Sequence, residues 1–359
     1  MMATKKLLDR ATTVRQGEEL NLDALGAFLR SQIPGLEGAE VEVLQFPSGH
    51  SNLTYLLRIG KSELVLRRPP FGAKIKTAHD MQREYHILTC LRPVYPKVPR
   101  PLAYCPDEAV LGAPFYVMER LQGVILRGTQ PEGLELLPAV MQKLSENFVD
   151  NLVAIHRLDY QSVGLGNLGH PEGYVRRQVE GWTQRYLNAK TDDIPEMLHV
   201  AAWLSENLPP DNPPALIHND YKYDNLVLDP TDLRQIIGVL DWEMATIGDP
   251  LMDLGTTLGY WLDLHDPPER QALSFGPTIL AGNLTRSEVA ERYATQSGGD
   301  LGNLAFYYVY ALFKIAVIVQ QIYARYKAGF SQDERFAKMI FAVYVLSNAA
   351  AQSMLTGVI

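Results

Sequence analysis

Two short stretches decide the fold: residues 218–225 read HNDYKYDN, and residues 239–243 read VLDWE. The first follows the spacing H-x-D-x-x-x-x-N, and the second places Asp241 at the end of a hydrophobic strand. Asp220 and Asp241 are 21 residues apart, which is enough for a short hairpin to bring both carboxylates together. With Asn225 they offer oxygen atoms, the ligands that Mg²⁺ prefers.

An alternative interpretation is that both stretches are turns between strands, since Asp and Asn favour turns. A bare H-x-D also occurs often by chance. The combination of Asp220, Asn225 and Asp241 with GDPLMDL at residues 248–254 favours a functional site. These are the groups that phosphoryl transfer requires: a carboxylate that orients and deprotonates the attacking hydroxyl, and ligands for the Mg²⁺ that bridges nucleotide phosphates.

The composition narrows the class of protein. In 359 residues, 47% are hydrophobic and 21% charged, which is typical of a globular domain with a large core. The net charge of −8 argues against a nucleic-acid partner, which would need a concentrated basic surface. Cys90 and Cys105 form no C-x-x-C pair, so the sequence predicts no structural zinc and a reducing, cytoplasmic setting.

Hydrophobic periodicity predicts the elements. Residues 41–44, 53–59, 63–67, 98–104 and 115–120 read as strands, with helices at 20–33 and 77–91. Helices are then predicted at 136–157, 172–188, 194–207, 286–297, 302–327 and 332–354, with short strands at 215–218, 225–229 and 236–241. Ser331 with Glu334 predicts a capping box for the last helix. Residues 306–323 are apolar but interrupted by Lys314, which indicates a buried helix and no membrane span.

This pattern predicts an α+β protein of two lobes. We expect a helical extension at residues 1–37, a small antiparallel β-lobe with one helix at 38–120, and a large, mainly helical lobe at 121–359. The nucleotide is expected on the small lobe, and the catalytic loop, metal site and acceptor site on the large one.

With these motifs the chain resembles the aminoglycoside phosphotransferase and choline kinase group, over about residues 41–344. SNLTY at 51–55, LRRPP at 66–70, REY at 83–85 and YVRRQVEGW at 174–182 resemble most closely the kinase-like domains associated with acyl-CoA dehydrogenases. The resemblance implies a bilobal protein-kinase-like fold and an ATP- and Mg²⁺-dependent small-molecule kinase. It implies that Asp220 is the catalytic base, that Asn225 and Asp241 bind Mg²⁺, and that His218 and Asp253 brace the loop. Lys222 is assigned to the same catalytic group.

Arg67 stands where kinases have a lysine that contacts the nucleotide phosphates, and Glu84 on the next helix is its expected partner. Arginine departs from the family pattern, but a guanidinium grips phosphate and carboxylate equally well. The alternative is a surface arginine at a strand end.

Two further segments are candidates for nucleotide contact. A small-residue hairpin can cover phosphates with backbone N–H groups, although an ordinary β-turn reads the same way. An extended linker between lobes can contact adenine. The candidate residues are Ser48, Gly49, Ser51 and Asn52 in the hairpin, and Met118, Glu119 and Leu121 in the linker.

The acceptor side carries less information. The helix at 302–327 has a polar and aromatic stripe, and a second helix carries three arginines; the candidates are Tyr310, Lys314, Arg325, Arg176, Arg177 and Arg185. Basic residues there indicate an anionic acceptor such as a hydroxyacyl-CoA or a hydroxy acid. The alternative is that they form ion pairs between lobes or solvated faces. His156, in HRLD at 156–159, ends a long helix and is predicted to serve helix packing rather than catalysis.

Three functional hypotheses follow. The first is an active small-molecule kinase using ATP or GTP with Mg²⁺. The second is a catalytically silent nucleotide-binding protein, which retention of Asp220, Asn225 and Asp241 disfavours. The third is an acyl-CoA dehydrogenase, which the sequence does not favour because no flavin site is visible. The sequence does not indicate an oligomeric state.

Overall fold

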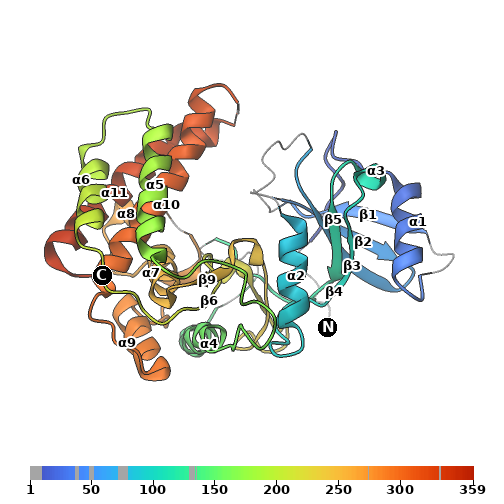
Figure 1. Ribbon diagram of the computed structural model, residues 1–359, viewed down its shortest axis with the longest axis horizontal. Helices are drawn as coiled ribbons and strands as arrows, with labels where there is room; N and C mark the ends of the chain where they lie inside the picture. The colour runs from blue at the N-terminus through green and yellow to red at the C-terminus, as the bar shows by residue number, and fades with distance from the viewer. Residues whose placement is uncertain are drawn as a thin grey trace. The chain divides into compact units, whose positions relative to one another are not determined.

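The computed structural model describes residues 10–36, 40–47, 52–71, 80–128, 134, 136–273, 275–330 and 333–359. The chain divides into two compact units, whose elements are labelled in Figure 1. Unit 1 comprises residues 1–125, 161–165 and 225–244, and unit 2 comprises residues 126–160, 166–224 and 245–359. Asp241 therefore belongs to unit 1 although it lies far along the sequence, and Asp220 belongs to unit 2.

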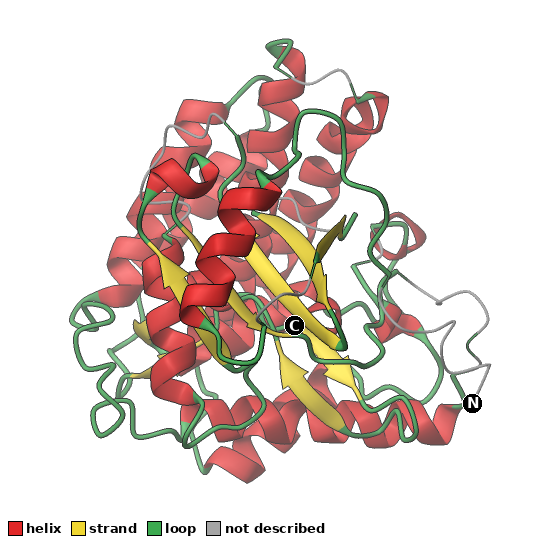
Figure 2. Cartoon of the chain, turned by 90° about the vertical axis from the view of Figure 1, so that its right-hand side faces the viewer, coloured by secondary structure: helices red, strands yellow, loops and turns green. Residues whose placement is uncertain are grey.

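Unit 1 is built on a five-stranded antiparallel sheet of order β1-β2-β3-β5-β4. Its strands are β1 (Val41–Gln45), β2 (Leu53–Ile59), β3 (Ser62–Arg68), β4 (Pro101–Cys105) and β5 (Phe115–Glu119). Side chains alternate between the two faces of a strand. The sheet therefore has two faces, each with its own packing partners. Figure 2 shows its strands in yellow and the helices in red.

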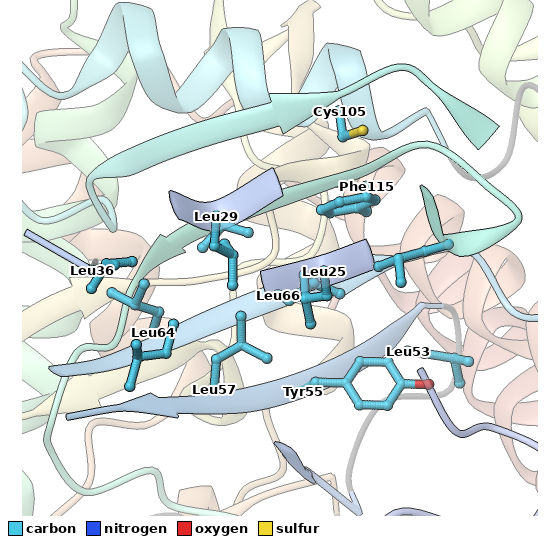
Figure 3. Packing of buried hydrophobic residues seen from close by; sticks show 13 residues of the cluster. Leu25, Leu29, Leu36, Leu53, Tyr55, Leu57, Leu64, Leu66, Cys105 and Phe115 are labelled. Atoms are coloured by element: carbon cyan, nitrogen blue, oxygen red, sulfur yellow. The ribbon is translucent and has the colours of Figure 1, made fainter. Parts of the chain in front are cut away.

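One face of the sheet packs against α1 (Leu22–Gln32) and carries the hydrophobic core of unit 1 (Figure 3). Asn21 caps this helix by accepting the Ala24 N–H, and the helix buries Leu25 and Leu29. The strands contribute alternate residues to the same cluster: Leu53, Tyr55, Leu57, Ile59, Leu64, Leu66, Phe115 and Val117. The N-terminal helix is thus part of the unit 1 core.

The opposite face packs against α2 (Met81–Leu91), which Asp80 caps by accepting the Arg83 N–H. Because Leu66 points into the core, its neighbour Arg67 points to the α2 side. Tyr116 shares this face, and its ring lies 6.2 Å from that of Tyr85 on α2. The alternation of β3 therefore places Arg67 beside α2.

Two further parts complete unit 1: the short helix α3 (Glu108–Leu111) and an antiparallel hairpin of β7 (Leu226–Leu228) and β8 (Ile236–Val239), which leads into η3 (Trp242–Met244). The strands at 53–59, 63–67 and 115–120 are confirmed to within one residue. The strand predicted from 98 begins only at Pro101, and the helix predicted from 77 begins at Met81, because Asp80 is its cap.

Unit 2 is mainly helical. Its helices are α4 (Pro138–His156), α5 (Tyr174–Ala189), α6 (Pro195–Glu206), α7 (Pro250–Tyr260), α8 (Pro268–Gln271), α9 (Arg286–Ser297), α10 (Leu304–Lys327) and α11 (Met339–Thr356), with η4 (Pro277–Ile279) and η5 (Glu334–Lys338). Strands β6 (Ala215–Ile217) and β9 (Thr246–Gly248) pair antiparallel. The short helix η2 (Tyr223–Asn225) follows residues 218–222, and its last residue, Asn225, belongs to unit 1.

Helix α10 is the central helix of unit 2 and contacts α5, α7 and α11. Gly255 of α7 allows close approach, because a Cβ there would lie 2.6 Å from the carbonyl oxygen of Tyr307 on α10. The prediction of a buried helix at 306–323 is confirmed by the burial of most of its residues. By length and composition alone, 304–327 and 334–356 could cross a membrane, but 72% of the apolar window of the first is buried inside the protein.

In unit 2 one prediction needs correction, and one helix was not predicted. The last helix begins at Met339, after η5, and Asp333 caps η5 by accepting the Arg335 N–H. The predicted capping residue Ser331 lies outside the described residues. Helix α7 was not predicted, although its sequence has an Asp249 cap followed by proline at the first helical position, a common start signal.

Candidate active site

The two predicted metal ligands, Asn225 and Asp241, lie at the same end of the β7–β8 hairpin in unit 1. Leu226 pairs with Val239, and the Leu240 N–H donates to the Asn225 carbonyl at 2.8 Å. Asp241 has a left-handed backbone with φ of 65°, and its side chain is one-third exposed. The hairpin therefore brings the Asn225 and Asp241 positions together.

Arg67 is the centre of an ion cluster in unit 1. Its guanidinium donates to Glu84 at 2.6 Å, to Asp241 at 3.0 Å and to Glu243 at 3.4 Å. The expected Arg67–Glu84 pair is thus present. A single arginine links the sheet, α2 and the segment that carries Asp241.

The electrostatics of this cluster follow from burial. Burial disfavours the charged form of Arg67, but the Glu84 and Asp241 carboxylates outweigh this and raise its pKa overall. For Glu84, burial raises the pKa more than the Arg67 charge lowers it. Arg67 thus faces three carboxylates, those of Glu84, Asp241 and Glu243.

Sequence reasoning missed two members of this cluster, Glu243 and Arg83. The Glu243 carboxylate accepts from Asn52, a predicted nucleotide residue, and the Glu243 carbonyl accepts from Arg83 at 3.0 Å. Glu243 stood in the quoted VLDWE stretch, so its proximity to Asp241 was the available signal.

The site's donors fit Mg²⁺. Within the described residues there is no group of three or more His, Cys, Asp or Glu that could hold a metal alone. Mg²⁺ does not need one, because it is usually bound by one or two protein oxygens together with water and substrate phosphates. Asn225 and Asp241 supply such oxygens.

The predicted catalytic loop in unit 2, residues 218–222, has its backbone fixed by buried side chains. The Asp253 carboxylate accepts the N–H groups of His218 and Asn219, each at 2.7 Å. His218 is fully buried, and its Nδ1 accepts the N–H of Asp220 at 3.3 Å. Asp253 thus pairs with the loop backbone, and His218 braces the residue predicted to act as base.

A second layer holds Asp253. His156 at the end of α4 lies 3.1 Å from the Asp253 carboxylate through Nε2 and 2.7 Å from the Tyr293 hydroxyl through Nδ1. Although burial favours the neutral acid, the hydrogen bond from His156 and the nearby charges hold the pKa of Asp253 below its ordinary value. His156 therefore supports the catalytic loop in addition to packing its helix.

Lys222 lies between two acids of the same loop. Its ammonium is 3.0 Å from Asp220 and 3.9 Å from Asp224, and 4.8 Å from the ring centroid of Tyr260. Burial disfavours its charge, but Asp220 and the other neighbours raise its pKa overall. Lys222 is therefore a cation held against the candidate base.

The remaining nucleotide candidates are placed as follows. Ser48, Gly49 and Ser51 lie outside the described residues. Met118 is buried on the α2 side of β5, whereas Glu119 pairs with Arg92 and Arg100. Leu121 packs on Gly238, where its Cδ1 would lie 2.3 Å from an added Cβ.

The six acceptor candidates are not all placed together. Arg176, Arg177 and Arg325 are exposed, and Arg177 donates to the carbonyls of Glu172 and His170. Tyr310 and Lys314 are buried. Three of the six lie in one region: the cationic groups of Arg185 and Lys314 are 4.4 Å and 5.8 Å from the ring centroid of Trp182, and Arg185 interacts electrostatically with Tyr310.

Comparison with known proteins decides the family. A model described as "Phosphotransferase enzyme family" matches residues 42–289. The chain belongs to this family. The chain is also similar to a protein of Ralstonia eutropha assigned as an aminoglycoside phosphotransferase, with 28% identity and a TM-score of 0.79, covering 94% of this chain and 99% of that one. The resemblance inferred from the motifs and the kinase-like fold are confirmed.

Two further proteins are similar to this chain. It is 37% identical to acyl-CoA dehydrogenase family member 11 of Gallus gallus, over 91% of this chain and 43% of that protein. The chain thus spans less than half the length of the curated relatives it matches. A spectinomycin phosphotransferase solved with ADP and spectinomycin has a TM-score of 0.57 at 12% identity, covering 94% of this chain and 99% of that one, which shows the fold alone.

Proposed function

We propose that this chain is an active kinase that transfers the γ-phosphoryl group of ATP to a hydroxyl of a small molecule. The observation that carries the proposal is the fixed catalytic loop: Asp220 lies against Lys222 on a backbone that His218 and Asp253 hold. Such a preorganised carboxylate suits a general base. A protein that only binds nucleotide would not need it.

In the proposed reaction, Asp220 accepts the proton of the acceptor hydroxyl as its oxygen bonds to the γ-phosphorus. The bond from the γ-phosphorus to the bridging oxygen breaks, and ADP leaves. Arg67 and Lys222 offset negative charge on the phosphates, with Glu84 fixing Arg67. When bound at Asn225 and Asp241, Mg²⁺ would neutralise phosphate charge.

We further propose an anionic acceptor, such as a hydroxy acid or a hydroxyacyl-CoA. One exposed cation, Arg185, lies 4.4 Å from the ring centroid of Trp182 in the unit that carries Asp220. We also infer that the dehydrogenase name of the relatives belongs to the part of them that this chain does not span. A cytoplasmic location with no nucleic-acid partner remains our expectation from the charge and the cysteines.

The test is ADP formation from ATP with Mg²⁺ against a panel of hydroxyacyl-CoAs, hydroxy acids, choline, aminoglycosides and sugars. Asp220→Asn serves as the blank, and Asp193→Asn is the control because this side chain is 80% exposed. Acceptor-dependent turnover that the blank loses by about 10²–10⁴-fold, with ATP affinity retained, supports the proposal. Calorimetry that detects ATP binding with no turnover for any acceptor would favour the silent nucleotide-binding protein.

A further inference from the structure

The peptide group that joins Asn219 to Asp220 is held at both of its polar atoms. Its carbonyl oxygen accepts from Lys314 Nζ at 3.2 Å, and its N–H donates to His218 Nδ1 at 3.3 Å. This group sets the direction in which the Asp220 side chain leaves the backbone. Lys314 and Asn219 are 95 residues apart in sequence, so α10 reaches the loop through this contact.

The conformation at Asn219 needs such support. Its φ of 67° is left-handed, a region that costs free energy for residues other than glycine and persists only when the surroundings enforce it. Asp253 accepts the Asn219 N–H, and the Tyr174 hydroxyl lies 3.2 Å from Asn219 Nδ2. Lys314 adds the contact at the carbonyl. Every polar group of Asn219 therefore has a partner.

Lys314 is an unusual residue for its surroundings. It is 3% exposed on α10, among apolar neighbours, and makes no ion pair with any residue that the structure describes. Burying an ammonium without a carboxylate partner is costly, and an apolar side chain would pack at lower cost. Its single hydrogen bond, to the Asn219 carbonyl, indicates why a lysine stands there.

We propose that Lys314 is a positioning residue that fixes the Asn219–Asp220 peptide and thereby aims the Asp220 carboxylate. The effect on turnover rests on the proposed kinase function, but the effect on loop geometry does not. This role differs from the acceptor binding that the sequence suggested for Lys314, and the two roles predict different results.

Lys314 loses its charge at a lower pH than an ordinary lysine. Burial lowers its pKa to about 8, despite attraction by Asp220 and Asp253, and repulsion by Lys222 and Arg185 adds to the lowering. Tyr174 and Tyr310 also face this region, but burial raises the pKa of each, so both stay neutral. As the pH rises through about 8, the hydrogen bond to Asn219 loses its charge assistance and weakens.

Backbone NMR of the full chain tests the geometric part without any acceptor. The Asp220 amide resonance should titrate with a midpoint near pH 8 in the wild type and should lose this titration in Lys314→Met. Lys143→Met, at an exposed lysine of the same unit, should keep it. An Asp220 amide that does not move between pH 7 and 9, or that still titrates in Lys314→Met, overturns the proposal.

Kinetics then separate positioning from acceptor binding. In Lys314→Met, positioning predicts a kcat at least tenfold lower, an unchanged KM for the acceptor, and loss of the decline in kcat above pH 8. Acceptor binding predicts instead a raised KM, shared with Arg185→Met, and this outcome overturns the proposal. If no acceptor is turned over, the proposed function fails while the amide titration still decides the role of Lys314.

Discussion

Two left-handed residues, Asp241 in unit 1 and Asn219 in unit 2, are stabilised by different means. Among the residues that the structure describes, they are the non-glycine positions with positive φ. Asp241 belongs to an ion cluster in which Arg67 faces three carboxylates. Asn219 is held by hydrogen bonds to its backbone and side-chain amide.

This difference matches two tasks. In unit 1 the Glu84, Asp241 and Glu243 carboxylates converge on Arg67, and such a cluster is suited to receive a divalent cation and its phosphates. In unit 2 the Asp220 and Asp224 carboxylates have Lys222 between them, and Lys314 lies close by. The hydrogen bonds of Asp253 and Lys314 to the backbone of residues 218–219 suit a loop that must hold one geometry. We infer that unit 1 is built for charge binding and unit 2 for rigid positioning.

The largest effect should come from removing charge at Asp241. We expect Asp241→Asn to lower turnover on the order of 10³-fold, because metal stabilisation of phosphate charge is worth several kcal/mol. Nucleotide affinity should lose its dependence on Mg²⁺, as measured by calorimetry with and without the ion. Glu42→Gln, at an exposed residue of the same unit, is the control. An unchanged Mg²⁺ dependence would remove Asp241 from the metal site.

The next largest effect should be a loss in the free energy of unfolding. Arg67→Met should destabilise the protein by about 3–5 kcal/mol, because it leaves the buried Glu84 carboxylate without its partner. Urea unfolding measures this loss. The double variant Arg67→Met/Glu84→Met should recover most of the stability and none of the activity. If the double variant stays as unstable as the single one, the cluster contributes packing rather than charge pairing.

The sequence predicted the elements of this site better than its contacts. The sequence predicted that Arg67 pairs with Glu84 on the next helix, and this pair is present. The alternation of side chains along the strand explains why Arg67 faces that helix. Periodicity does not encode which distant side chain meets a given face. The contacts of Lys314 with Asn219 and of His156 with Asp253 span 95 and 97 residues, so they emerge only from the tertiary fold.

Lowering the pH should weaken the contribution of Asp253 to the stability of unit 2. Asp253 has a lowered pKa in the folded state, so the stability it adds is present above its ordinary value of 3.8 and is lost as the pH falls below it. Asp253→Asn should cost about 2–3 kcal/mol at pH 7, since hydrogen bonds to a charged group are lost. The cost should shrink below pH 4 in denaturant titrations. A cost that is constant with pH would mean that the ionised form of Asp253 is not what stabilises the loop.

The smallest expected change in stability is a gain rather than a loss. It comes from replacing Lys314, the proposed positioning residue. Lys314 has a folded-state pKa of about 8 against an ordinary 10.5, so burying its charge costs up to about 3 kcal/mol at neutral pH. Lys314→Met removes this cost but also the bond to Asn219, so we expect a net gain of about 1–2 kcal/mol. Because the folded state releases the proton first, wild-type stability should rise relative to the variant between pH 8 and 10.5.

The gain from Lys314→Met should therefore diminish over this range, which thermal unfolding at several pH values will measure. Lys143→Met, at an exposed lysine, should show no such trend. A variant that is more stable yet slower would show that the lysine is retained for the geometry of Asp220 at the expense of stability. A variant that is both less stable and slower would make Lys314 an ordinary structural residue, and the contrast between a charge-binding unit 1 and a positioning unit 2 would lose its strongest support.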